Sequence, residues 1–361
     1  MEPQCGFMRC SVMSDDSQHQ RAQQPNRGRN AMTPGAIPWR GWKDIAYRLF
    51  VGFNENRVLL TAAGVTFFLL LALAPSLSLF VALYSLLNNP GSVVQQLALL
   101  DGVIPDSGLD IVRDQLMRLT SQDERSLGIT LIISLGAALW GAGAGIKALF
   151  EAMNVVYGEQ EKRNFFKVNL LALIFLLGGL VLTIVMLSVV LVLPVVLSLL
   201  YLARYEWLVQ LGAYAILLLF LLLAVSALYR WGPSREEASW RWVSPGSFFA
   251  ALGIMAASAL FSWYAANFSN YSATYGSLGA IVAMLTWVWL SVTIVILGGS
   301  LNSEIEHQTA EDSTTGDAKP LGQRGAFVAD TVGERWPARG GGTVPDVPDG
   351  ERPADQPTAA S

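Results

Sequence analysis

The sequence has little of what enzymes and disulfide-stabilised proteins rely on. Its 361 residues include only two cysteines and two histidines, and 14% of them are charged, against about 25% in soluble domains. It contains no Cys/His metal-ligand spacing, no GxxxxGK[ST] phosphate loop and no GxSxG nucleophile elbow. These absences argue against hydrolytic or metal-dependent catalysis, so we expect neither an enzyme nor a bound cofactor or metal.

Apolar residues are abundant instead, and they are gathered into long runs. Hydrophobic residues make up 52% of the chain. A helix needs about 20 consecutive apolar residues to cross a hydrocarbon layer about 30 Å thick. Six such runs are present, with Lys147 as the one charged residue within them, at residues 59–87, 127–150, 168–202, 207–229, 247–268 and 276–301. The sequence therefore predicts an all-α membrane domain over residues 58–306 with six transmembrane helices.

Two of these runs contain a proline. The third run would form about 50 Å of helix, which is longer than the hydrocarbon core is thick. Proline removes an intrahelical hydrogen bond and clashes with the preceding turn, so Pro194 is the predicted break in this run. Pro75, in the first run, predicts either a kink or a broken helix of the kind that lines binding sites in transporters.

The basic residues fall on alternate sides of the predicted spans. Eight precede the first run, three follow the second, three lie between the fourth and fifth, and five follow the sixth, whereas the intervening segments hold four. Because cytoplasmic segments carry the excess of Lys and Arg, both termini are predicted to be cytoplasmic. Cys5 and Cys10 then lie in a reducing compartment, and no disulfide is expected.

Both ends of the chain lack apolar periodicity. Residues 1–38 are rich in Gln, Ser, Arg and Pro, and residues 307–361 are rich in Gly, Pro, Asp, Thr and Ala. Such segments bury too little apolar surface to offset the loss of chain entropy on folding. We therefore expect two disordered cytoplasmic tails and no cleaved signal peptide, so that the first membrane helix directs insertion.

Residues 39–57, between the first tail and the first run, predict an amphipathic helix that lies in the headgroup region. Aromatic and apolar residues recur at helical spacing, and cations that can meet anionic lipid take the other positions. We interpret the helix either as an anchor that sets the angle of the first span or as a lipid-regulated gate. The apolar positions are Trp39, Trp42, Ala46, Leu49 and Phe53, and the cations are Arg40, Lys43 and Arg48.

The longest segment on the external side, residues 88–126, predicts a short amphipathic helix after Ser107. Its apolar face either packs on the outer ends of the spans or covers the mouth of a cavity and handles substrate. Leu109, Val112, Leu116 and Leu119 form this face.

Several stretches carry a resemblance to a known family. They include ALWGAGAGIKALFEAMNVVYGEQEKRNFFK, LYRWGPSREEASWRWVSPGSFFA and SWYAANFSNYSATYGSLGAIVAMLTWVWLSVTIVILGGSLNSEIEH. Across residues 40–307 the chain resembles the YihY/virulence factor BrkB family of bacterial inner-membrane proteins, once labelled ribonuclease BN. The resemblance implies six helices, a location in the bacterial inner membrane, and a role in transport or envelope integrity.

Polar residues at the inner end of the second run form the first candidate site. Lys147 and Glu151 are one helical turn apart, and Asn154 continues the same face. One interpretation is a lysine that extends toward the headgroups and pairs with the glutamate. The other is a site that binds an anionic headgroup or couples to a proton. In the same run Gly141 and Gly145 predict close packing against another helix.

The turn between the fifth and sixth runs forms the second candidate site. Its uncharged polar side chains could bind a sugar or phosphate headgroup, or belong to the interfacial aromatic belt, with Gly276 supplying the turn. These side chains are Asn267, Asn270, Tyr271, Thr274 and Tyr275.

The last run ends in Asn302 and Glu304 at the inner boundary. Glu304 is predicted to pair with an arginine of residues 230–241, such as Arg230 or Arg241. Such a pair would hold the inner ends of two helices together.

The leading functional hypothesis is a transporter or flippase-like protein for a lipid or other amphiphile. A nearly charge-free membrane domain suits such a substrate better than a small ion that moves along buried carboxylates. The alternative is a non-transporting scaffold that binds membrane lipids or partner proteins. Ribonuclease activity and nucleic-acid binding are not expected, because the cytoplasmic loops are too short for an RNA-binding domain. The sequence leaves the substrate's identity and the oligomeric state open.

Overall fold

The computed structural model of this chain describes residues 15–87, 124–199, 206–268 and 278–336. The regular elements in these ranges are helices, which confirms the all-α class. The long helices are α3 (Val58–Leu87), α6 (Glu124–Tyr157), α7 (Phe165–Leu199), α8 (Glu206–Trp231), α9 (Trp240–Phe268) and α11 (Leu278–Glu306). The shorter ones are α1 (Asp15–Ala22), the 3-10 helix η1 (Pro34–Ala36), α2 (Trp39–Glu55) and α12 (Phe327–Asp330).

Three helical segments of the described part are long and apolar enough to cross a membrane. They are Phe165–Leu182, Trp240–Tyr264 and Ile281–Glu306. A fourth candidate is the bent pair of α2 with the first part of α3, Val58–Ala72, in which the two axes differ by 58°. These segments support a membrane protein with several apolar helices. The total of six spans and the interfacial placement of α2 stay predictions.

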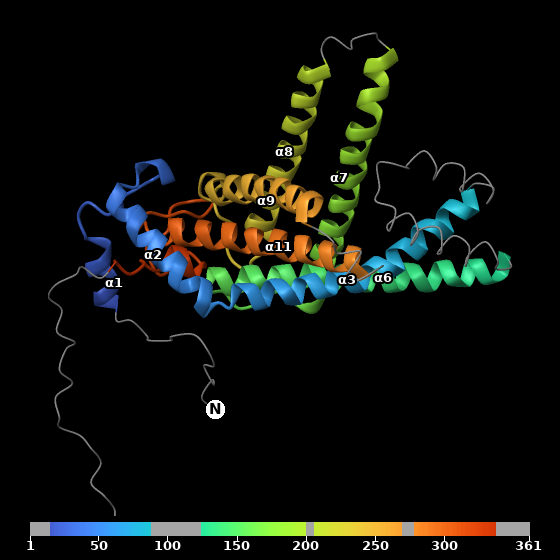
Figure 1. Cartoon of the computed structure of the whole chain (residues 1–361). Coiled ribbons are helices and arrows are strands. Elements are labelled where there is room, and N and C mark those ends of the chain that lie inside the picture. The colour runs from blue at the N-terminus through green and yellow to red at the C-terminus, as the bar shows by residue number, and fades with distance from the viewer. Residues whose placement is uncertain (1–14, 88–123, 200–205, 269–277, 337–361) are drawn as a thin grey trace, which may run out of the picture.

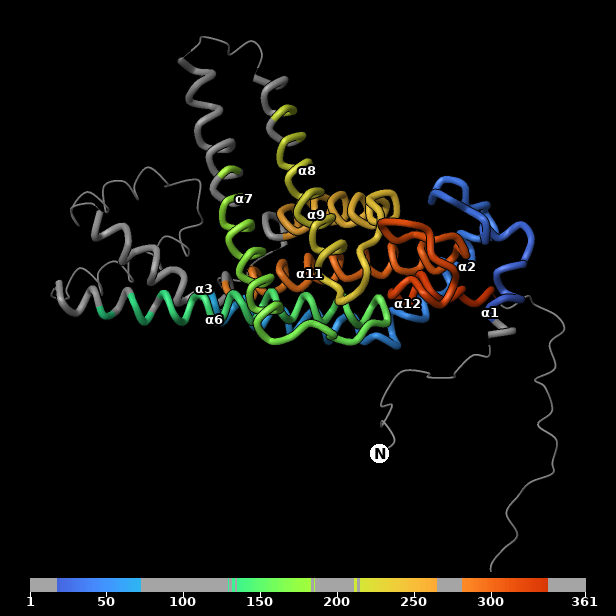
Figure 2. The backbone as a smooth tube through the Cα atoms, turned by 180° about the vertical axis from the view of Figure 1, so that it is seen from behind, coloured from blue at the N-terminus to red at the C-terminus, as the bar shows by residue number. Residues whose placement is uncertain are grey.

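The long helices form a central layer and a projecting hairpin. In Figure 1, α3 and α6 lie side by side, and α11 runs along them with α9 next to it. The hairpin of α7 and α8 rises steeply out of this layer, as the view from behind also shows (Figure 2). α7 packs on α6 where it leaves the layer, and α8 packs on α9 where it returns.

Glycines let the central helices approach closely. A Cβ atom at Gly141 would lie 3.0 Å from Ala72 Cα, and one at Gly145 would lie 3.0 Å from Leu69 Cδ2. The predicted strip of small residues on α6 therefore packs directly on α3. Where α9 crosses α11, a Cβ atom at Gly246 would overlap the Gly298 carbonyl oxygen. A larger side chain at these glycines would force the helix backbones apart.

The largest buried side chains lie between α3, α6, α8 and α11, and include Phe150, Met153, Tyr157, Tyr229 and Ile296. The buried Tyr229 hydroxyl donates to the carbonyl oxygen of Val295 at 2.6 Å, so its polar atom is satisfied. Outside this core, large apolar side chains on α6 and α7 point away from the protein. Exposed apolar surface on this scale is typical of contact with lipid.

The helix break predicted at Pro194 is wrong. α7 continues as one helix from Phe165 to Leu199, and α3 continues through Pro75 from Val58 to Leu87. α9 likewise contains Pro245. One proline removes a single backbone hydrogen bond, and the remaining bonds of a long apolar helix are enough to carry it past that point.

The structure also corrects the prediction that both chain ends are disordered, for the parts that it describes. Residues 18–38 and 307–336 pack on each other and on the helix ends. The Arg29 side chain donates to the Gly333 carbonyl oxygen at 2.8 Å, and Gln308 donates to the Arg27 carbonyl oxygen at 2.8 Å. Composition did not predict this order because the partners lie almost 300 residues apart. Residues 1–14 and 337–361 lie outside the described residues.

The amphipathic segment forms helix α2, but its faces differ from the prediction. Trp39 and Phe50 are 73% and 72% exposed. Arg48, predicted to meet lipid, points inward. The buried face consists of Gly41, Asp44, Ile45 and Arg48.

Candidate functional site

Four segments that are distant in the sequence meet at one end of the bundle and form a polar cap. The cap comprises residues 18–38, 158–164, 231–239 and 307–336, and we call the last segment the C-terminal strap. The Ala310 amide donates to the Arg29 carbonyl oxygen at 2.7 Å, and the Phe327 amide donates to the Glu159 carboxylate at 2.7 Å. These are the segments that the distribution of basic residues predicted to lie on one side of the membrane.

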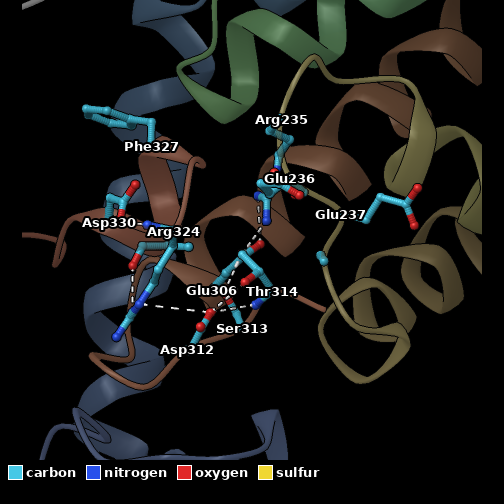
Figure 3. A network of polar contacts seen from close by, with 12 residues as sticks. Arg235, Glu236, Glu237, Glu306, Asp312, Ser313, Thr314, Arg324, Phe327 and Asp330 are labelled. Atoms are coloured by element: carbon cyan, nitrogen blue, oxygen red, sulfur yellow. Dashed lines mark hydrogen bonds and ion pairs between the residues drawn. The ribbon is translucent and has the colours of Figure 1, made fainter. Parts of the chain in front are cut away.

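The centre of the cap is a buried ion pair between Arg235 and Glu306 (Figure 3). Their side chains are each 1% exposed, and the two guanidinium nitrogens donate to the two carboxylate oxygens at 2.9 and 2.5 Å. Ser313 of the strap donates to the same carboxylate at 2.5 Å. Burial acts to lower the pKa of Arg235, but the adjacent Glu306 carboxylate raises it above its usual value. The Arg235 guanidinium therefore stays charged, and the pair joins the α8–α9 loop to α11.

The sequence predicted that Glu304 pairs with an arginine such as Arg230 or Arg241, but the structure shows a different partner. Its carboxylate accepts a hydrogen bond from Arg48 Nε of α2 at 2.5 Å. Arg230 instead pairs with Glu237 at 2.8 Å, and the guanidinium stacks over the Trp240 ring. The prediction chose the wrong partner because the cationic positions of α2, which include Arg48, were expected to meet lipid. Arg48 lies in the middle of α2 and not at a helix end.

Asp44 is the second buried carboxylate of the cap, with a side chain that is 1% exposed. Arg27 donates to both of its oxygens at 2.7 and 2.6 Å, and the Trp336 backbone amide donates at 2.8 Å. A carboxylate with this many donors is compensated despite its burial. Asp44 thus connects α2 to both ends of the chain.

Asn154 lies near the end of α6 and contacts two segments of the cap. Its side-chain oxygen accepts from the Ser234 amide at 2.7 Å, and its nitrogen donates to Glu161 at 3.2 Å. Hydrogen bonds from Arg163 lower the pKa of Glu161 to about 2. With both ends of the amide engaged, Asn154 positions the two loops that follow α6 and α8.

Asn302 joins the N-terminal part of α9 to the C-terminal part of α11. Its side chain accepts from the Gly246 amide at 2.6 Å and donates to the Val243 carbonyl oxygen at 2.8 Å. These backbone groups flank Pro245, which interrupts the hydrogen-bond ladder of α9. Asn302 therefore binds the α9 backbone on both sides of the proline.

Lys147 is the candidate that remains beside the apolar part of the helices. Its ammonium group donates to the side-chain oxygen of Asn169 on α7 at 3.1 Å. The predicted partner Glu151 is exposed, and among the described residues no carboxylate forms an ion pair with Lys147. The structure thus brings Lys147 together with Asn169, a residue that the sequence did not single out, where α7 leaves α6.

The second candidate site is largely outside the described residues. Asn267 lies in α9, but nothing is described of its side chain. Asn270, Tyr271, Thr274, Tyr275 and Gly276, together with the predicted external helix after Ser107, lie outside the described residues.

His307 directly follows α11 and lies in the cap. Burial, together with the positive charges of Arg48, Arg29 and Arg21, holds the pKa of His307 well below its usual value. Its Nε2 atom lies 3.0 Å from the Thr331 hydroxyl, which also donates to the Phe327 carbonyl oxygen. Because that hydroxyl proton is engaged elsewhere, the ring donates from Nε2 to the Thr331 oxygen. Burial and the nearby positive charges favour the neutral ring.

Sequence reasoning missed Asp44, Arg48, Arg235 and Glu306. One signal was available, since two acids, Glu304 and Glu306, end a helix that is otherwise uncharged. Acids at a helix C-terminus are unfavourable to the helix dipole and require cationic partners. The spacing of residues along the sequence does not show which of the nearby arginines are these partners.

The chain is similar in sequence to known proteins. The family described as virulence factor BrkB matches residues 49–321. The ribonuclease-like protein YfkH of Bacillus subtilis is 34% identical over 67% of this chain and 88% of its own length. A UPF0761 membrane protein of Neisseria meningitidis serogroup B is 27% identical over 72% of this chain.

The matched region spans 62% of the length of that Neisseria protein. A UPF0761 membrane protein of Methylibium petroleiphilum is 25% identical over 75% of this chain and 64% of its own length. No solved structure matches. The match to the family over most of the sequence leaves one conclusion: this chain belongs to the virulence factor BrkB family.

Proposed function

We propose that this protein is a transporter or flippase-like protein that moves a lipid or another amphiphile across the bacterial inner membrane. The observation that carries the proposal is the Lys147–Asn169 contact, which places a charged and an amide side chain beside exposed apolar helix surface. An amphiphile has the same two parts, a polar headgroup and apolar chains.

The apolar surface continues from Lys147 along α6. At about 3.6 residues per turn, Ile133 and Trp140 lie on the same face as Lys147. Trp140 is 65% exposed, and Ile133 is exposed as well. On α7, Leu173 lies one turn beyond Asn169 on its face and is also exposed. An acyl chain can therefore follow either helix away from a headgroup at Lys147.

The charge of Lys147 indicates the kind of headgroup. Its single described partner is a neutral amide, so the ammonium group keeps hydrogen-bonding capacity and an uncompensated positive charge. A charge beside the hydrocarbon region is costly unless it is paired. An anionic headgroup would supply the missing partner, and we propose that the substrate carries one.

We further propose six spans with both termini in the cytoplasm. The contacts between residues 18–38 and 307–336 support an even number of crossings, because both segments must be on one side of the membrane to form them. The exposed Trp39 and Phe50, with Lys43 between them, support an interfacial position for the outer face of α2.

The alternative is a scaffold that binds lipids or partner proteins without moving them. The extensive polar cap favours it, since a folded cytoplasmic surface offers contacts that two disordered tails would not. For this chain we propose no covalent chemistry in either case.

Reconstitution separates the two functions. Vesicles with this protein and a fluorescent phosphatidylglycerol analogue in both leaflets are treated with a membrane-impermeant reductant that bleaches only the outer leaflet. A transporter lets the bleached fraction rise beyond that of protein-free vesicles, whereas a scaffold leaves it unchanged. A phosphatidylcholine analogue in the same assay tests the headgroup, since the proposal expects it to move more slowly.

A further inference from the structure

Both ends of the chain converge on the buried face of α2. We call residues 18–38 the N-terminal arm. Asp44 accepts hydrogen bonds from Arg27 of this arm and from the Trp336 amide of the C-terminal strap. One turn later, Arg48 donates to Glu304 of α11 at 2.5 Å and to the Glu334 carbonyl oxygen of the strap at 2.8 Å. Two neighbouring side chains of α2 therefore contact three other segments.

The arm and the strap also hold each other. Arg29 is buried, and its guanidinium donates to the carbonyl oxygens of Gln308 at 3.0 Å and Gly333 at 2.8 Å. Gly333 lies directly against Arg48, since a Cβ atom added there would be 2.6 Å from the guanidinium carbon. Residues 18–38, the strap and the buried face of α2 thus form one connected set of contacts.

The other end of α2 is a sharp bend. The axes of α2 and α3 differ by 58°, and Arg57 at the junction has a φ angle of +48°. This left-handed conformation is unfavourable for a non-glycine residue. No continuous helix connects α2 to α3, so α2 is held in place mainly by what its inner face contacts.

We infer that the N-terminal arm and the C-terminal strap form a latch that fixes α2 against α11, and that α2 pivots about Asn56–Arg57 when the latch opens. Such a movement would carry Trp39 and Phe50 on the outer face of α2 with it. The inference goes beyond the proposed function and does not depend on it, because it concerns the position of one helix.

Distances between spin labels test the latch in the full chain reconstituted in vesicles. Cys5 and Cys10 are first replaced by serine. Lys43→Cys with Gln323→Cys then reports the distance between α2 and the strap, and Lys43→Cys with Ser244→Cys reports the distance between α2 and α9. All three label positions are exposed.

Asp44→Asn combined with Arg48→Gln should broaden both distance distributions and shift their centres, whereas Arg40→Gln, on the exposed side of α2, should leave both unchanged. Gly333→Ala provides a second variant that loosens the strap without removing any charge, and it should broaden both distributions to a smaller extent.

Two results would overturn the inference. Unchanged distributions in both latch variants would mean that these contacts do not hold the strap. A broadened strap distance with an unchanged α2–α9 distance, in a variant that stays folded by circular dichroism, would mean that the strap is held but does not fix α2.

Discussion

Arg235 and Glu306 form a doubly hydrogen-bonded ion pair in which both side chains are 1% exposed, 71 residues apart in the sequence. The Arg235 guanidinium also lies 5.1 Å from the centre of the Tyr157 ring. The pair therefore joins the C-terminal ends of α6, α8 and α11 at one point. Several predictions about the cap depend on the cost of leaving a buried charge unpaired.

Removal of one partner should destabilise the protein strongly. Glu306→Gln leaves the Arg235 guanidinium buried without its counter-charge, which costs about 3–5 kcal/mol. We expect a large fall in the midpoint of thermal unfolding in detergent, measured by tryptophan fluorescence.

The matched control is Lys162→Gln, which breaks the ion pair with Glu159. Lys162 is 60% exposed, whereas Glu159 is 3% exposed and keeps the hydrogen bond from the Phe327 amide. We therefore expect this substitution to lower the midpoint by much less than Glu306→Gln. Equal effects of the two substitutions would contradict the account of the cap.

Two glycines of α6 should respond to alanine in opposite ways. Gly141→Ala places a Cβ atom 3.0 Å from Ala72 Cα, and such overpacking costs about 1–3 kcal/mol. A Cβ atom at Gly143 meets nothing within 4 Å, so Gly143→Ala should be neutral or stabilise by about 0.5–1 kcal/mol through helix propensity. Unfolding midpoints of the two variants, measured side by side, check the difference. An unchanged or raised midpoint in Gly141→Ala would show that the two helices do not approach at Gly141.

The stability of the cap should fall as the pH decreases below about 6.5. His307 has a lowered pKa in the folded cap, so between that pKa and about 6.5 the unfolded chain binds a proton that the folded chain does not. Stability then falls by up to about 1.4 kcal/mol per pH unit.

Unfolding midpoints between pH 5 and 8 check this dependence. His307→Gln should flatten the curve in that window, and His19→Gln, which removes an exposed histidine, should not. An unaltered slope in His307→Gln would assign the pH dependence to other groups.

The topology can be tested by cysteine accessibility. With Cys5 and Cys10 replaced by serine, Gln115→Cys and Tyr205→Cys should react in intact cells with a membrane-impermeant thiol reagent. Gln323→Cys, in the strap, should react only after the membrane is permeabilised. Reaction of Gln323→Cys in intact cells would place the polar cap outside.

The sequence predicted the parts of the fold that depend on local pattern. The described residues of each long apolar run lie in a helix, and the small residues Gly141 and Gly145 pack on α3 as expected. These features follow from helical periodicity and side-chain size, which a single chain displays directly.

The polar cap was not predictable in the same way. Asp44 and Arg48 looked like surface charges of an amphipathic helix, because nothing near them in the sequence shows that Arg27, Glu304 and the strap fold over them. The tails had the composition of disordered segments, and their order comes from contacts between the two ends. The sequence singled out Lys147 but not its partner Asn169. Asn169 lies on the next helix, α7, and only the path of the chain after α6 brings the two side chains together.

The central claim is that Lys147 binds the headgroup of an amphiphile that this protein moves. The most direct measurement is the rate at which the fluorescent phosphatidylglycerol analogue changes leaflet in vesicles that contain wild type, Lys147→Met or Lys147→Arg, with Lys43→Met as a control. The account predicts a rate reduced at least about tenfold in Lys147→Met, equivalent to about 1.4 kcal/mol, a smaller loss in Lys147→Arg, and no change in the control. A Lys147→Met protein that is folded and moves the lipid at the wild-type rate would contradict it.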